Sequence, residues 1–185
     1  MTTGSPLRAL FLAATFVATI ASMAEAQPRA EIGASLVNSV IGLGDNNDLS
    51  TVGIPSGGFG VLNPGIYASI FFGTRAAIEP QLGLIWASSD GESQHILNFV
   101  GQFDYFVLGT GASSPYVFAA AGVVDISDLD YTPKSFGVGA GYRIPVGDRL
   151  TFRIDGRYTH FTGAFEGDDS DALGFTLSIG GIFGQ

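Results

Sequence analysis

The fold is decided by the stretch Leu150-Thr151-Phe152-Arg153-Ile154-Asp155-Gly156-Arg157-Tyr158. Apolar residues, glycine and tyrosine occupy every second position, and the positions between them carry a hydroxyl or a charge. Successive side chains of a β-strand point to opposite faces, so this period of two predicts a strand with one apolar and one polar face. A helix would need apolar positions three and four residues apart.

The same alternation extends in both directions along the chain. We expect eight strands, near residues 30–41, 62–73, 76–88, 94–108, 115–125, 134–145, 149–162 and 172–184. Three connections are short, at 73–75, 109–114 and 146–148, and four are longer and polar, at about 42–61, 89–93, 126–133 and 163–171. Alternating short turns and longer loops are typical of a bacterial outer-membrane barrel. Pro80 should mark a bulge or a position without a hydrogen-bond donor in its strand.

The composition is unusually apolar for a protein that dissolves in water. The mean hydropathy is +0.34 and only 14% of the residues are charged, whereas a soluble domain carries about a quarter. After Ala26, no apolar run is long enough for a transmembrane helix. A closed barrel is the other structure that satisfies its backbone in lipid. The predicted fold is therefore all-β, an eight-stranded antiparallel up-and-down transmembrane β-barrel.

The charged residues of the strands lie opposite the apolar set, so we expect them inside the barrel. Their cost in lipid would be a few kcal/mol each near the midplane, roughly 2–4 for Arg. The predicted interior network consists of Glu31, Glu79, Gln81, Asp104, Arg143, Arg153, Asp155 and Arg157. Side chains just fill the interior of eight strands, which favours a plugged core over a wide pore. The alternative is a lipocalin-type soluble barrel with its apolar face inward.

The N-terminus has the pattern of a signal peptide. Arg8 precedes the apolar run 9–20, and Ala24-Glu25-Ala26 offers small residues for cleavage. We expect a signal peptide over residues 1–26 and a barrel domain over 27–185, with a retained N-terminal anchor as the alternative. The chain has no cysteine, which excludes lipoprotein anchoring and disulfides.

The chain resembles the OmpA/OmpX-like family of small outer-membrane barrels over its whole mature part, and most clearly in its C-terminal half. The resemblance rests on the glycine-rich segment 135–143, the tight turn 146–149 and the Arg-containing strand 150–158. It implies export to the bacterial outer membrane. Such chains often end on an aromatic residue, whereas here Phe183 is followed by Gly184-Gln185.

The predicted outer loops are acidic. Their carboxylates are Asp45, Asp48, Asp90, Glu92, Asp125, Asp128, Asp130, Glu166, Asp168, Asp169 and Asp171, with Lys134 at the edge. The net charge of −9 disfavours nucleic acid and polyanions as partners. We expect contact with outer-membrane lipid and lipopolysaccharide. Divalent cations could bridge the loop carboxylates to lipopolysaccharide phosphates. The alternative is that the acidic loops are simply solvated and bind no cation. No cofactor is expected, and the barrel is expected to be a monomer.

One segment resembles the active-site strand of the PagL family of lipid A 3-O-deacylases. It reads Arg157-Tyr158-Thr159-His160-Phe161-Thr162-Gly163-Ala164, against a family pattern of Arg, aromatic, any residue, His, any residue, Ser, Asn, Ala. The resemblance implies His160 as base and Thr162 as nucleophile. A carboxylate is needed to orient the imidazole ring, and Glu166 or a nearby Asp could serve, although neither aligns with the family's acid. Threonine in place of serine and Gly163 in place of asparagine depart from the pattern.

Two function classes follow from these patterns. The favoured one is a non-enzymatic outer-membrane barrel with a structural or surface-binding role through its acidic loops. The alternative is a lipid A hydrolase that uses His160 and Thr162. A small porin-like channel is a third and weaker alternative, because the interior is predicted to be filled.

Overall fold

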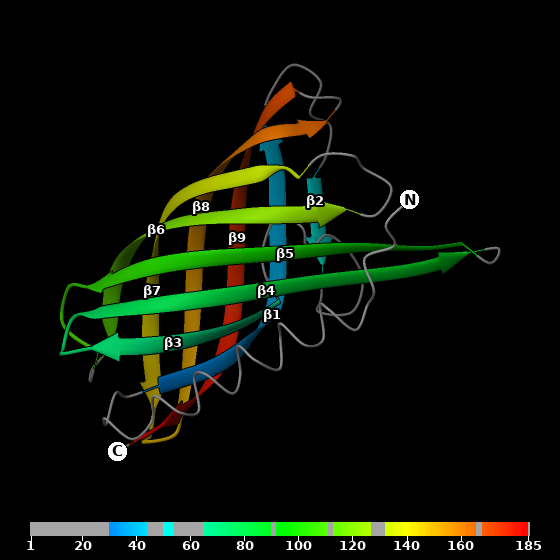
Figure 1. Cartoon of the computed structure of the whole chain (residues 1–185). Coiled ribbons are helices and arrows are strands. Elements are labelled where there is room, and N and C mark those ends of the chain that lie inside the picture. The colour runs from blue at the N-terminus through cyan, green and yellow to red at the C-terminus, as the bar shows by residue number, and fades with distance from the viewer. Residues whose placement is uncertain are drawn as a thin grey trace.

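The structure, a computed structural model, describes residues 30–43, 50–53, 65–89, 92–110, 113–126, 132–165 and 168–184. The expected signal peptide lies outside these residues. Their strands, shown in Figure 1, are β1 (Ala30–Leu43), β2 (Ser50–Gly53), β3 (Ile66–Phe72), β4 (Ala76–Ser89), β5 (Glu92–Phe106), β6 (Ser114–Ile126), β7 (Lys134–Val146), β8 (Leu150–Phe165) and β9 (Asp168–Phe183). Within the described residues, no helix is long and apolar enough to cross a bilayer.

The barrel is closed by pairing between its first and last strands. Neighbouring strands from β3 to β9 pair antiparallel in chain order, β1 pairs with β3, and β1 returns to β9 from Ala30↔Phe183 to Leu43↔Asp171. This confirms the eight-stranded antiparallel up-and-down fold. The pairs Phe72↔Ala76 and Val146↔Leu150 flank short turns. Because the strands alternate in direction, these turns lie at the same end of the barrel as the Ala30↔Phe183 pair.

β2 is a ninth strand inside the region predicted as a loop at 42–61. It pairs with the second half of β1, from Ile41↔Ser50 to Asn38↔Gly53, whereas β3 pairs with Ala30–Ala34 of β1. The loop prediction was wrong at this position. Four residues are too few to reveal a period of two, so only the pairing identifies this strand.

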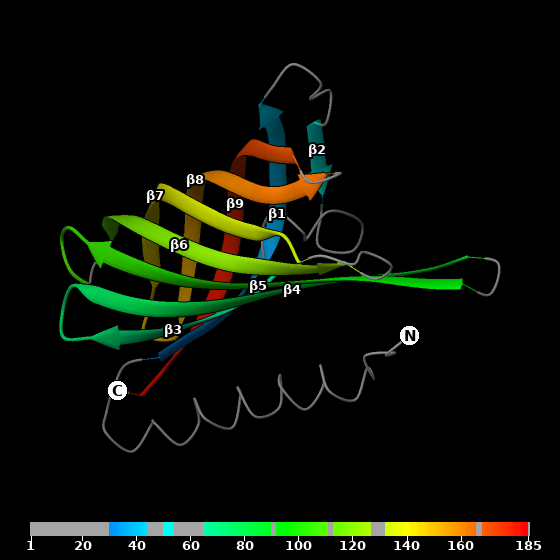
Figure 2. The same cartoon turned by 45° about the horizontal axis from the view of Figure 1, so that its top comes forward.

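The hairpins at the opposite end are longer than predicted. β8 and β9 pair as far as Phe165↔Asp168, so much of the predicted loop 163–171 is strand, with a register shift after Phe161. β4 and β5 pair as far as Ser89↔Glu92. Figure 2 shows this hairpin projecting beyond the other strands. Hydropathy misses these extensions because backbone pairing continues into polar segments where the apolar alternation stops.

Pro80 lies where the β3–β4 ladder is interrupted. The two strands pair at Tyr67↔Gln81 and again at Ile70↔Ile78, in one unbroken register, while Pro80 pairs with Gly101 on its other side. Of the two predicted outcomes, the bulge is therefore wrong and the missing donor position is correct. Proline has no N–H to contribute to the ladder.

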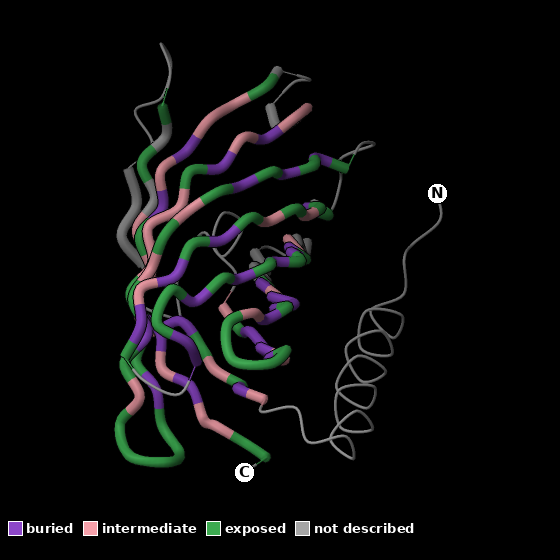
Figure 3. Tube along the Cα trace, turned by 90° about the vertical axis from the view of Figure 1, so that its left-hand side faces the viewer, coloured by how far each residue is buried: buried purple, intermediate pink, exposed green. Residues whose placement is uncertain are grey.

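Burial alternates along the strands, as the colours of Figure 3 show. In β7, Ser135 is 5% exposed, Phe136 is 54% exposed, and Arg143 is again buried at 2%. The polar and charged residues therefore face the interior and the apolar residues face outward. This arrangement is the reverse of a lipocalin-type barrel and removes that alternative.

Candidate functional site in the barrel interior and at its outer rim

A charge pair between β1 and β7 lies near the end of the barrel that carries the short turns. Arg143 donates from Nε to Oε2 of Glu31 over 2.9 Å, and its Nη2 lies 2.8 Å from the same oxygen as an ion pair. Tyr67 donates to the other carboxylate oxygen over 2.8 Å, and Arg143 Nη1 donates to the carbonyl oxygen of Thr110 over 2.6 Å. The pair thus connects β1, β3, β7 and the turn that follows β5.

A second charge pair lies further along the interior. Arg153 of β8 is paired with Glu79 of β4, which also accepts a hydrogen bond from Ser69. The guanidinium carbon of Arg153 lies 4.7 Å from the ring centroid of Tyr67 and 5.0 Å from that of Tyr116. Arg153 Nη2 also donates to the Tyr116 hydroxyl over 2.8 Å. Cation–π contacts are stronger in such desolvated places, so Arg153 fastens β8 to three other strands.

The network continues outward through two glutamines. Arg157 donates from Nη2 to the side-chain oxygen of Gln81 over 3.0 Å and also to that of Gln102. Gln81 donates to Gln102 over 3.0 Å, and Gln102 donates to Asp104 Oδ1 over 2.6 Å. Buried polar groups are tolerated when they satisfy one another in this way.

The structure brings together all eight residues that the sequence placed in the interior. Asp155, the eighth, lies 3.9 Å from Arg153 Nη2. Sequence reasoning left Tyr67, Tyr116 and Gln102 out of the predicted network. The available signal was their position in the alternation, because Tyr116 shares the inward face of β6 with Ser114 while Val117 faces outward.

An aromatic cluster fills the interior beside these charges. It consists of the rings of Phe71, Phe106, Tyr116 and Phe118, together with the methyl group of Ala77. The ring centroids of Phe106 and Tyr116 are 5.1 Å apart, and those of Tyr116 and Phe118 are 6.1 Å apart. A Cβ at Gly139 would overlap the Phe118 ring, and one at Gly141 would overlap Tyr116. The glycines of β7 therefore provide the space that the inward rings occupy.

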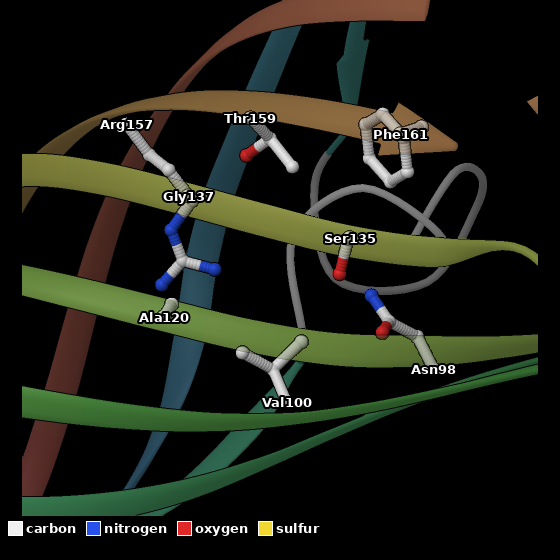
Figure 4. Close-up of a pocket in the computed structure, with 8 residues that line it drawn as sticks. All are labelled: Asn98, Val100, Ala120, Ser135, Gly137, Arg157, Thr159 and Phe161. Carbon is white, nitrogen blue, oxygen red and sulfur yellow. The ribbon is translucent and has the colours of Figure 1, made fainter. Parts of the chain in front are cut away.

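A small cavity lies at the outer end of this network (Figure 4). The lining residues are Asn98, Val100, Ala120, Ser135, Gly137, Arg157, Thr159 and Phe161. Figure 4 shows the Arg157 guanidinium at one end of the cavity and the Phe161 ring toward the other. The cavity offers hydroxyls, an amide and a guanidinium for hydrogen bonding. Among the described residues that line it, there is no carboxylate or histidine to act as a general base.

A second group of polar residues lies on the outside, where β8 and β9 leave the apolar part of the barrel. Tyr158 donates to Asp171 Oδ1 over 2.7 Å, and Nδ1 of His160 is 2.9 Å from the same oxygen. Nε2 of His160 is 3.9 Å from Asp169 Oδ2. The hydrogen bonds from Tyr158 and His160 lower the pKa of the exposed Asp171 carboxyl below its ordinary value.

This group includes part of the predicted catalytic set. His160 and Thr162 lie on the outward side of β8, because Phe161 between them is buried and lines the cavity. Glu166 lies outside the described residues. The acid that contacts His160 is Asp171, which the β8–β9 register places opposite it. That acid could be found only from the register, because eleven sequence positions separate the two residues.

Most of the predicted acidic loop residues lie outside the described part of the chain. Within the described part, no cluster of three or more His, Asp or Glu side chains is arranged to hold a metal ion. Divalent cations therefore stay a prediction for the loops.

Apolar side chains surround the outside of the barrel. The exposed ones include Ile66, Phe72, Ile78, Leu84, Phe99, Phe103, Val117, Val123, Phe136, Val138, Ile144, Ile154, Phe175 and Phe183. A soluble protein rarely exposes a contiguous apolar patch beyond a few hundred Å². A charged interior within an apolar exterior defines the class of the transmembrane β-barrels.

No protein-family model matches the chain, and no curated protein matches it either. Among solved structures, the chain is similar to the crystal structure of Ail, the attachment invasion locus protein of Yersinia pestis. The identity is 13%, the match covers 85% of this chain and 99% of Ail, and the TM-score is 0.46. The structure of Ail in complex with the heparin analogue sucrose octasulfate gives the same identity and coverage with a TM-score of 0.49. The strand pairing of the chain itself carries the fold assignment.

Proposed function

We propose that this chain is a non-enzymatic outer-membrane protein that holds acidic loops at the bacterial surface. The observation that carries the proposal is the apolar exterior of a closed barrel, whose buried charges form a network in the interior. In water, that exterior would be a large uncovered hydrophobic surface. In a bilayer it is covered by lipid, and the pairing of the first and last strands satisfies their backbone groups.

The height of the apolar exterior fits a bilayer. In β8 the outward residues Leu150, Phe152, Ile154 and Tyr158 are exposed, each by 36% or more. From Leu150 to Tyr158 the strand spans about 20 Å along the barrel axis, at about 3.3 Å per residue and a tilt of about 40°. The apolar band of an outer-membrane barrel is about 25 Å tall.

The filled interior favours a structural or surface-binding role over conduction. A channel would need open space in the middle of the barrel. That space is occupied by the ion pair between Arg153 and Glu79 and by the aromatic cluster. We therefore place any specific recognition in the loops at the Asp171 end of β9. Their negative charge favours cations and disfavours sulfated polymers as ligands, so the sulfated compound bound to Ail in the complex is not the expected ligand here.

The location is tested by expressing the full chain in a Gram-negative host and separating the membranes. The expected result is a protein in the outer-membrane fraction that runs faster on a gel when it is not boiled, because a barrel stays folded in detergent. Recovery as a soluble periplasmic monomer would refute the proposal. A surface-exposure assay with protease on intact cells then tests whether the acidic loops face outward.

A lipid A hydrolase is the second candidate, and one contact favours it. The bond between His160 Nδ1 and Asp171 leaves Nε2 directed away from the acid, as in an acid–base pair that activates a nucleophile. Two observations count against a hydrolase. Nε2 of His160 faces Asp169 and not the hydroxyl of a nucleophile. Thr162 adjoins Gly163, which has a φ of +66° and lies within the register shift, so the regular strand geometry is interrupted beside the proposed nucleophile.

Mass spectrometry of lipid A from cells that express the wild type or His160→Ala decides between the candidates. The non-enzymatic proposal expects identical lipid A in both strains, with both proteins folded in the outer membrane. Loss of one acyl chain only with the wild type would make the chain a hydrolase.

A further inference from the structure

Among the residues that the structure describes, the interior of the barrel contains one acid more than its bases. Its acids are Glu31, Glu79, Asp104 and Asp155, and its bases are Arg143, Arg153 and Arg157. Glu31 is paired with Arg143 and Glu79 with Arg153. Arg157 is the remaining base for Asp104 and Asp155, and its hydrogen bonds go to the neutral amide oxygens of Gln81 and Gln102.

The two remaining acids are incompletely satisfied. Among the described residues, Oδ2 of Asp104 and Oδ1 of Asp155 are buried and accept no hydrogen bond. Both lie at the edge of ion-pair range from the same atom, Nη2 of Arg153, at 4.0 and 3.9 Å. Asp104 is 0% exposed, so solvent does not stabilise its negative charge.

We propose that the Asp104–Asp155 pair binds one proton at neutral pH, which makes the barrel interior electrically neutral. Burying an ionised carboxylate without a counter-charge costs so much free energy that the group takes up a proton instead. Two interacting acids titrate as a pair, so the proton belongs to both. A metal ion is a poor substitute, because the Arg153 guanidinium lies within 4.0 Å of both oxygens and would repel it.

Six strands contribute further charged or titratable groups to the interior network that contains this pair. They are Glu31 on β1, Tyr67 on β3, Glu79 on β4, Tyr116 on β6, Arg143 on β7, and Arg153 and Arg157 on β8. The two tyrosine hydroxyls are already donors to Glu31 or acceptors from Arg153. They are neutral at physiological pH and leave the charge count unchanged.

Proton binding makes the stability of the barrel depend on pH. Above pH 4 or so the unfolded chain has its aspartates ionised, so the folded state holds one proton more than the unfolded state. Stability then falls as the pH rises, until the folded pair releases its proton. Over that range the equilibrium constant for unfolding rises about tenfold per pH unit.

Infrared spectroscopy of the refolded full-length barrel at neutral pH tests the proposal. The wild type is expected to show the C=O band of one protonated carboxylic acid. Asp104→Asn and Asp155→Asn should each abolish the band, because either change leaves three acids with three arginines. Asp148→Asn, the same substitution in an exposed turn, should leave it unchanged.

The possible results separate clearly. Absence of the band in the folded wild type would overturn the proposal, and so would its persistence in both asparagine variants. If one variant fails to fold, the other and the pH dependence of wild-type unfolding still decide, because stability that stays constant between about pH 5 and neutral pH contradicts the bound proton. The test does not depend on the cellular location of the barrel.

Discussion

Arg143 and Glu31 are 112 positions apart in the chain and form a buried, hydrogen-bonded ion pair inside the barrel. One residue lies on β7 and the other on β1, and these strands are not neighbours in the sheet. They meet because closing the sheet brings its inward faces together across a narrow interior. The pair is therefore a direct test of barrel closure.

Arg143→Met should destabilise the barrel by about 3–5 kcal/mol, because it leaves the buried Glu31 carboxyl group without its partner. Urea unfolding in lipid vesicles, followed by gel mobility, measures this change in the free energy of unfolding. Arg149→Met removes the same charge from an exposed turn residue and should change stability by about 0.5 kcal/mol or less. Equal effects for the two variants would contradict the buried pair.

Gly139→Ala and Gly156→Ala should differ sharply although both glycines lie mid-strand. A Cβ at Gly139 points inward and would overlap the ring of Phe118 and the carbonyl oxygen of Gly156, which should cost about 1–3 kcal/mol. A Cβ at Gly156 points outward and meets Phe175 at an ordinary 3.5 Å. The same unfolding assay compares them, and a large loss at Gly156 alone would mean that the inward and outward faces are reversed.

Ile154→Arg should destabilise the membrane-embedded barrel by about 2–4 kcal/mol, because it places a charge in the middle of the apolar band. Val146→Arg, at the end of β7 beside the short turn, should cost only about 0–1 kcal/mol. Unfolding in vesicles gives both values. A barrel that is not embedded in lipid would tolerate both substitutions about equally.

Immobilised heparin should not retain the folded protein, even at low ionic strength. The net charge is −9, and Arg8 and Glu25 cancel, so removal of residues 1–26 leaves it unchanged. Like charges repel most strongly where salt does not screen them. Retention that disappears with rising salt would reveal a local basic surface and would redirect attention to Lys134.

The outer hairpins show where prediction from hydropathy stops. The alternation that defines β8 ends near Tyr158, yet its pairing with β9 continues to Phe165↔Asp168. Pairing there is carried by backbone groups, which are the same in every residue, so the side-chain pattern does not record it. The contact of His160 with Asp171 was hidden for the same reason, since it follows from the register.

The sequence alone was enough to determine which face of each strand is polar, and with it the interior position of Glu79, Asp104 and Arg153. A period of two and the cost of a charge in lipid leave only one orientation. Only the tertiary structure decided which charges pair, that Tyr67 and Tyr116 flank Arg153, and that Asp104 and Asp155 remain without a full partner. Those relationships depend on the register and closure of the sheet, which place residues from distant strands within a few ångströms of one another.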